Sequence, residues 1–246
     1  MDEELTEKLK YLRLRGLLAN WDEYLKMARK GRFSHVRLLE HIVEDEYKLK
    51  CENVRECRLK RAHIPEMLVM ETYPFDRQPK LDRKKTLSLY DGFEYMTKSR
   101  NITWVGPTGV GKSGLAIGFL IQAINRGYTG RHVLFRDLLD ELHASVADHS
   151  EKKVIKRYLA CDCLLIDELG YVEVEPTQVG LFFTLMHKRH RKKPTLITSN
   201  LGFSEWRSFL KNDHLAAALI DRLTDNSYVI NMKDCDTLRP KLSIDT

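Results

Sequence analysis

The stretch Gly106-Pro107-Thr108-Gly109-Val110-Gly111-Lys112-Ser113 decides the fold of this chain, because it matches the phosphate-binding pattern GxxxxGK[ST]. An apolar strand, 102–105, is expected before the loop, and an Ala-, Ile- and Leu-rich helix after it. Glycines permit the turns that point backbone N–H groups at a phosphate, and the N-terminus of the helix attracts negative charge. We therefore expect all eight residues to bind a nucleotide, with Lys112 at the β- and γ-phosphates and the Ser113 hydroxyl on Mg²⁺. The alternative is a Gly-rich turn that matches by chance, which the flanking strand and helix make rare.

A second apolar strand, 163–166, ends in two acids, Asp167 and Glu168. Taken alone, such a pair is usually a solvated turn, but after a phosphate-binding loop the pattern favours catalysis. We expect Asp167 to hold Mg²⁺ through water and Glu168 to act as the general base on the attacking water. A glutamate in this place suits ATP hydrolysis by a motor or switch. A GTPase would need an NKxD motif, and the nearest text, 231–234, reads Asn-Met-Lys-Asp; the expected nucleotide is therefore ATP.

The next apolar strand, 195–198, runs into the polar residues Thr198-Ser199-Asn200. Ligands of α/β sheets bind at the carboxyl ends of the strands. We therefore expect the Asn200 side chain to reach the γ-phosphate or the lytic water. The alternative is that Asn200 only caps the end of its strand.

The chain as a whole alternates short apolar runs with amphipathic segments, which predicts an α/β fold. We expect a parallel five-stranded sheet with helices on both faces, its strands being 102–105, 132–135, 163–166, 195–198 and 228–230. Helical periodicity predicts a small helical domain over 1–75 and the nucleotide-binding domain over 76–246, with a proline-containing linker from Tyr73 to about Asp82 and a helix over 84–98. The tail after the last strand is too short for a C-terminal helical lid, so another subunit would have to complete the pocket, or it would stay open.

Further motifs make the chain resemble the IstB-type transposition helper ATPases of the AAA+ family, to which the DnaC helicase loader is related. They are Leu165–Tyr171 (LIDELGY), Thr198–Asn200 (TSN) and Leu219–Leu223 (LIDRL), together with the helical leader that contains YLRLRGL at 11–17 and Glu46. The resemblance covers nearly the whole chain. It implies that Arg222 is an arginine finger for a neighbour's ATP and that Arg239 is a second sensor. The chain departs from the family by having Thr237-Leu238 where Ser-Tyr is usual; the alternative for either arginine is a surface residue.

The resemblance also implies a function. It suggests an ATPase that forms a homo-oligomer with shared ATP sites, assembles on double-stranded DNA, and recruits or stimulates the transposase encoded by the same element. A loader of a replicative helicase is the alternative from the same fold, and a monomeric P-loop kinase is the alternative from another class. The sequence contains no DDE set, nuclease motif or metal-binding His/Cys cluster, so we expect a partner to cut and join the DNA.

Basic residues outnumber acidic ones by 41 to 35, which is compatible with a polyanionic partner but does not require one. Three basic stretches are candidate DNA contacts. They are Lys188, Arg189 and Arg191 in the block 187–193; Lys152, Lys153, Lys156 and Arg157 on one helix stripe; and Arg55, Arg58, Lys60 and Arg61. For the first stretch the alternative is that cations at a helix C-terminus offset the helix dipole. None has interleaved aromatics, so we expect contacts to the phosphates of a duplex.

Several features point to the bacterial cytoplasm. No apolar run approaches the ~18 residues of a membrane span, and the N-terminus MDEELTEKLK resembles neither a secretory signal nor a transit peptide. The five cysteines form no CxxC pair, and we expect them to be reduced and buried.

Overall fold

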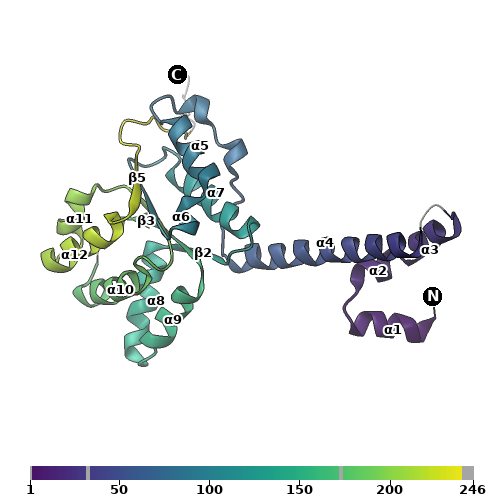
Figure 1. Cartoon of the computed structure of the whole chain (residues 1–246). Coiled ribbons are helices and arrows are strands. Elements are labelled where there is room, and N and C mark those ends of the chain that lie inside the picture. Colours follow the sequence, from purple (N-terminus) through teal and green to yellow (C-terminus); the bar gives the residue numbers. More distant parts are fainter. Residues whose placement is uncertain (1, 32–33, 172–173, 240–246) are drawn as a thin grey trace, which may run out of the picture. The chain divides into compact units, whose positions relative to one another are not determined.

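The computed structural model describes residues 2–31, 34–171 and 174–239, and the chain divides into two compact units, Met1–Cys57 and Arg58–Thr246. The first unit is helical, as expected, and consists of α1 (Glu3–Tyr11), α2 (Arg15–Ala19), α3 (Trp21–Arg29) and most of α4 (His35–Arg61) (Figure 1). The α4 helix runs unbroken for 27 residues. The stretch from His35 to Arg61 holds no glycine or proline, so nothing interrupts the backbone hydrogen bonds.

Close backbone packing at Gly16 organises the first unit. The buried Glu46 of α4 accepts a hydrogen bond from the Leu17 N–H at 3.0 Å. A Cβ at residue 16 would lie only 2.8 Å from the same carboxylate oxygen. Tyr24 of α3 donates to Asp45 of α4 at 2.9 Å. The glycine and glutamate of the helical leader therefore form one contact that joins α2 to α4.

The second unit is built on the expected five-stranded parallel sheet, which has the order β2-β3-β4-β1-β5. Its strands are β1 (Asn101–Val105), β2 (Gly130–Leu134), β3 (Cys163–Leu169), β4 (Thr195–Ser199) and β5 (Ser227–Asn231). The helices are α5 (Arg83–Gly92), α6 (Glu94–Thr97), α7 (Lys112–Asn125), α8 (Phe135–Ala147), α9 (Glu151–Ala160), α10 (Pro176–Arg189), α11 (Phe203–Phe209) and α12 (Asp213–Thr224), with 3₁₀ turns η1 (Met70–Thr72) and η2 (Phe75–Arg77).

Both faces of the sheet are covered by apolar packing, which confirms the expected layered architecture. Along β3, Cys163 and Leu165 belong to one hydrophobic cluster, while Leu164 and Ile166 belong to another. Alternate residues of a strand point to opposite faces. The first cluster includes residues of α7, and the second includes residues of α8, α10, α11 and α12.

Three local features differ from the sequence expectations. The helix expected over 84–98 is divided at Phe93, whose φ of 55° ends α5 and precedes α6. Phe135, expected in a strand, begins α8. The stretch around Tyr73–Asp82 packs into the second unit, where Phe75 and Leu81 are buried in the cluster that contains Trp104. These residues therefore belong to the body of the nucleotide-binding unit.

The cysteines are only partly as expected. Cys161, Cys163 and Cys235 are buried, but Cys51 and Cys57, which lie on α4, are exposed. Within the described ranges, no helix is long and apolar enough to cross a bilayer.

Candidate nucleotide-hydrolysis site

The loop between β1 and α7 has the backbone conformation that a phosphate-binding loop needs. Gly109 and Gly111 adopt φ values of 83° and 91°, a region that side-chain-bearing residues rarely enter. The α7 helix then begins at Lys112, so its first N–H groups face the loop. The Lys112 ammonium donates to the carbonyls of Gly106 at 2.8 Å and Pro107 at 2.7 Å. Burial lowers the pKa of Lys112, although the nearby carboxylates of Asp167 and Glu168 oppose that shift.

Asp167 lies at the centre of a buried hydrogen-bond network at the carboxyl ends of the strands. Its Oδ1 accepts from Ser113 Oγ of α7 at 2.9 Å and from Thr198 Oγ1 of β4, and its Oδ2 lies 3.4 Å from His132 Nε2 of β2. Burial by itself raises the pKa of this carboxyl. The hydrogen bonds from His132, Thr198 and Ser113 outweigh burial, so the pKa lies below its ordinary value and the group is anionic.

Glu168 owes its exposed position to an irregularity in β3. The pairing of β3 with β4 shifts register between Ile166 and Leu169, and Glu168 has a φ of 63°. Its N–H donates to Thr198 Oγ1 at 3.0 Å and to Asp167 Oδ1 at 3.2 Å, which holds the bulge in place. The two neighbouring acids consequently differ: Asp167 is buried, and Glu168 is exposed at the pocket.

One pocket of about 690 Å³ brings these elements together. Its lining includes Thr108, Gly109, Gly111, Lys112 and Ser113 of the loop region, with Glu66, Glu168, Tyr171, Thr198, Leu238 and Arg239. The Tyr171 hydroxyl lies 2.7 Å from Thr108 Oγ1, so it spans the pocket. The Arg239 side chain passes over Gly109, where an added Cβ would lie 3.3 Å from Arg239 Cδ.

Thr198, and not Asn200, is the residue of the TSN motif that lines this pocket. Asn200 Oδ1 is buried, has no hydrogen-bond partner among the described residues, and lies against Gly170. Thr198 could have been found from the sequence as the last residue of its apolar run. The register shift that brings its hydroxyl to Glu168 could not be foreseen.

Arg222 lies on α12, outside the lining of the pocket. Its guanidinium covers the Phe183 ring of α10, with 4.8 Å from Cζ to the ring centroid, and its Nε donates to His187 Nδ1 at 3.1 Å. Within one chain, Arg222 is therefore not part of the Asp167 network or of the pocket lining.

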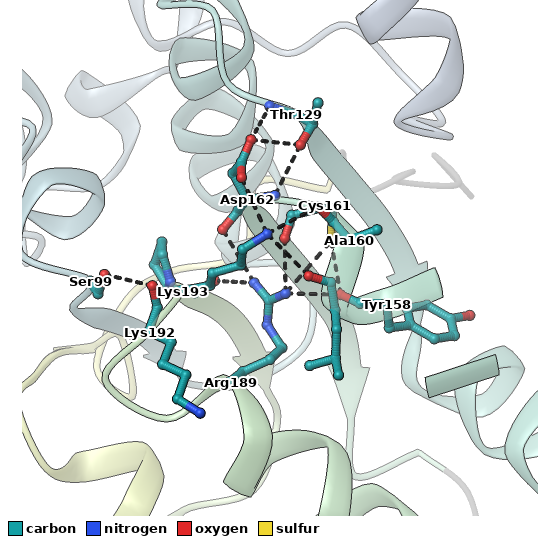
Figure 2. Close-up of polar contacts among 11 residues, drawn as sticks. Ser99, Thr129, Tyr158, Ala160, Cys161, Asp162, Arg189, Lys192 and Lys193 are labelled. Carbon is teal, nitrogen blue, oxygen red and sulfur yellow. Dashed lines mark hydrogen bonds and ion pairs between the residues drawn. The ribbon is translucent and has the colours of Figure 1, made fainter. Parts of the chain in front are cut away.

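Arg189, which was expected to be a candidate DNA contact in the block 187–193, is buried. The side chain is 1% exposed. It donates to the carbonyls of Tyr158, Cys161 and Asp162, as Figure 2 shows. It also donates to the Pro194 carbonyl and to Thr195 Oγ1. The guanidinium joins the end of α9 to the residues just before β3 and to the start of β4, so it cannot reach a phosphate.

The other basic candidates differ in what they contact. Arg191 is exposed but forms a two-point pair with Asp225, at 2.8 and 3.1 Å. Arg157 pairs with Glu141. The remaining exposed candidates in the second unit are Lys60, Arg61, Lys152, Lys153, Lys156 and Lys188.

Comparisons with known proteins agree with the fold and the site. The family described as IstB-like ATP binding protein matches residues 7–244. The chain is 31% identical over 234 residues to the insertion sequence IS21 putative ATP-binding protein of Pseudomonas aeruginosa, covering 94% of this chain and 86% of that protein. It is 28% identical over 233 residues to the insertion sequence IS5376 putative ATP-binding protein of Geobacillus stearothermophilus, covering 95% and 92%.

A solved structure carries the same fold at lower identity. The DnaC helicase loader superposes with a TM-score of 0.52 and 21% identity, covering 61% of this chain and 87% of that one. At this identity the likeness supports the fold alone. The family match spans almost the whole chain and includes both the phosphate-binding loop and the acidic strand end. The chain therefore belongs to the IstB-like ATP binding proteins and is an ATPase with the AAA+ fold.

Proposed function

We propose that this chain is an ATP-dependent regulator of an insertion-sequence transposase, which acts as a homo-oligomer on duplex DNA in the bacterial cytoplasm. The observation that carries the proposal is the convergence of Lys112, Ser113, Glu168 and Thr198 on one pocket beside the buried Asp167. The names of the relatives, which are ATP-binding proteins of insertion sequences, support the transposition context. They match over 90% of the chain, whereas the helicase loader matches 61%, which favours the transposase over a replicative helicase as the partner.

Binding of the nucleotide falls to the loop and α7. The backbone N–H groups of 108–113 would surround the phosphates, and Lys112 would exchange its two carbonyl partners for phosphate oxygens. Ser113 Oγ and Asp167 Oδ1, 2.9 Å apart, are oxygen donors of the kind that suits Mg²⁺. When bound there, Mg²⁺ would offset the charge of the β- and γ-phosphates.

Hydrolysis falls to Glu168. Its carboxylate is exposed at the pocket, where it takes a proton from the attacking water. Thr198 acts as the positioning residue for both acids, because its hydroxyl donates to Asp167 and accepts from the Glu168 N–H. Arg239 at the rim adds positive charge beside the phosphates. Asn200, which contributes no lining, would act only through Gly170 and the loop that follows Glu168.

Replacing Glu168 with Gln tests the hydrolytic role and its link to DNA. The amide cannot take the proton of water, so turnover should fall at least ~100-fold while ATP binding is kept. The variant should also remain on duplex DNA with ATP and support recruitment of the transposase without release. The control is Glu52→Gln, which makes the same change of charge on an exposed part of α4. The measurements are phosphate release and duplex binding in ATP; equal turnover by wild type and Glu168→Gln would refute the assignment.

The shared-site part of the proposal concerns Arg222. We propose that it leaves its contacts with Phe183 and His187 and meets the ATP of a neighbouring subunit. Such a finger contributes ~10³–10⁵ in rate in related phosphoryl-transfer systems. Arg222→Ala should therefore bind ATP nearly normally and hydrolyse it poorly.

Mixing inactive subunits separates a shared site from a monomeric enzyme. Lys112→Ala lacks a working loop but keeps its Arg222, so mixtures with Arg222→Ala should regain part of the turnover. Mixing Lys112→Ala with Glu168→Gln is the control. Neither variant has both a working phosphate-binding loop and a working base in its own pocket, so a neighbour's Arg222 cannot restore turnover. Recovery in the control mixture, or none in the test mixture, would contradict the shared site.

The exposed lysines of α9 are the DNA contacts that this proposal favours. Lys152, Lys153 and Lys156 lie on one exposed stripe of that helix, whereas Arg189 is buried and Arg191 is paired with Asp225. Cations on a helix surface suit contacts to phosphates with little sequence reading.

A further inference from the structure

The last described part of the chain crosses the phosphate-binding loop. After β5, the Met232 N–H donates to the Val105 carbonyl at 2.7 Å, and the chain turns at Cys235. The segment Asp236–Arg239, here called the strap, then passes over the loop, where the Leu238 N–H donates to the Gly109 carbonyl at 2.8 Å. The contact is close, because a Cβ at residue 111 would lie 2.8 Å from Leu238 Cδ1.

Two neighbouring side chains from the proline-containing stretch hold the other side of the strap. Arg77 Nη2 donates to the Leu238 carbonyl at 2.9 Å. Gln78 Nε2 donates to the Asp236 carbonyl at 2.6 Å and to the Val110 carbonyl at 3.0 Å. Gln78 is 1% exposed, so its amide links the strap to the loop inside the protein. Arg77 is exposed and spans the surface between η2 and the strap.

These anchors determine where Arg239 lies. They hold residues 236 and 238 through main-chain carbonyls, and Arg239 follows directly, with its Cγ and Cδ over Gly109. The strap contains no helix or strand, so no regular hydrogen-bond ladder fixes it. Within residues 2–31, 34–171 and 174–239, no carboxylate pairs with the Arg239 guanidinium, which lines the pocket beside Thr108 and Lys112. The anchors, together with the exposed ion pair between Lys80 and Asp236 at 4.0 Å, are therefore the contacts that keep this cation at the phosphate end of the pocket.

We infer that Arg77 and Gln78 are positioning residues, which hold the strap so that Arg239 distinguishes ATP from ADP. The inference rests on the proposed function in that it takes the pocket to be the ATP site. The γ-phosphate adds negative charge that ADP lacks, so a cation fixed at this end of the pocket favours ATP. Once an anchor is lost, Arg239 moves with the strap, and the advantage of ATP over ADP falls.

The test is the ratio of ATP to ADP affinity, measured by displacement of a fluorescent nucleotide. Arg77→Met should weaken ATP binding about 10-fold and change ADP binding less than about 2-fold, as expected for loss of a hydrogen bond to a charged group. Arg239→Met should do the same. Because both act through one contact, the double variant should lose no more than either single variant. Arg83→Met is the matched control: Arg83 is an exposed neighbour that pairs with Asp76 and lies over Phe75, and it should leave the ratio unchanged.

A second variant covers the buried anchor. In Gln78→Glu the carboxylate keeps the size of the side chain but cannot donate to the carbonyls of Val110 and Asp236, and the affinity ratio should fall as in Arg77→Met. Equal loss of ATP and ADP affinity, or losses that add in the double variant, would overturn the inference while ATP hydrolysis by the wild type stands. Failure of the wild type to bind ATP at all would overturn the proposed function instead.

Discussion

Two buried charged groups lie at opposite ends of the same strands, and they are satisfied in different ways. Asp167, at the carboxyl end of β3, takes its hydrogen bonds mostly from side chains, those of Ser113, Thr198 and His132. Arg189, at the amino ends of β3 and β4, donates almost entirely to main-chain carbonyls (Figure 2). Side-chain hydroxyls can turn to a ligand without moving the backbone, whereas a carbonyl at the start of a strand cannot.

The difference separates a chemical role from a structural one. Asp167 adjoins a pocket and can exchange its partners for a metal ion and water. Arg189 is enclosed, and its loss leaves acceptors in an interior where water cannot replace the donor. Buried charge alone therefore does not identify a functional site; the kind of partner and the access to a pocket do.

The largest effect on stability is expected at the amino end. Arg189→Met keeps an unbranched apolar side chain but removes one hydrogen bond from each of the carbonyls of Tyr158, Cys161, Asp162 and Pro194, at a cost of ~3–5 kcal/mol. Urea unfolding measures it. Arg191→Met is the control, since solvent screens that exposed pair with Asp225 and its loss should cost far less stability. A loss at Arg189 no larger than at Arg191 would contradict the structural role.

A smaller effect concerns acid stability at the same end. Burial raises the pKa of Asp162, but hydrogen bonds from Thr129 and Lys193 outweigh it, so the pKa in the folded protein lies below the ordinary value. A group with a lowered pKa stabilises the fold at pH values above its unfolded pKa of about 3.9, and this stability is lost as the pH falls through the folded pKa. Asp162→Asn should therefore be less stable than wild type near neutral pH, and the gap should narrow in acid. The measurement is the urea midpoint of each protein across pH. A difference between wild type and Asp162→Asn that does not depend on pH would contradict this cause.

Much of the fold could be predicted because its signals are local. The motif in 106–113 predicts phosphate binding by itself, and apolar runs between amphipathic segments indicated the parallel sheet. Arg189 could not be placed from its own neighbourhood: at the end of α10 it looks like any cation that offsets a helix dipole, and its partners lie about 30 residues away at 158–162. The same limit applies to Gln78 and Asp236, which are separated by 158 residues.

Among the candidate site residues, the positions of those in a motif at the end of a strand were the easiest to predict. Asp167 and Glu168 lie where the sequence indicated, at the end of the third strand. Thr198 lines the pocket and Asn200 does not, and the Thr198 hydroxyl accepts from the Glu168 N–H at the register shift of β3. Irregularities of this kind depend on pairing between strands and leave no mark in a single sequence.

The most direct test of the difference between Asp167 and Arg189 measures two quantities for Asp167→Asn and for Arg189→Met. They are the ATP turnover per folded molecule and the free energy of unfolding. The amide at 167 can still accept from Ser113 and Thr198 but loses the charge that would hold Mg²⁺ in the proposed function. The account predicts a loss of turnover of at least ~100-fold for Asp167→Asn with stability within ~1 kcal/mol of wild type. It predicts the reverse for Arg189→Met, with turnover per folded molecule within about 3-fold of wild type and a large loss of stability. An Asp167→Asn protein that hydrolyses ATP normally, or a stable Arg189→Met protein that does not, would contradict it.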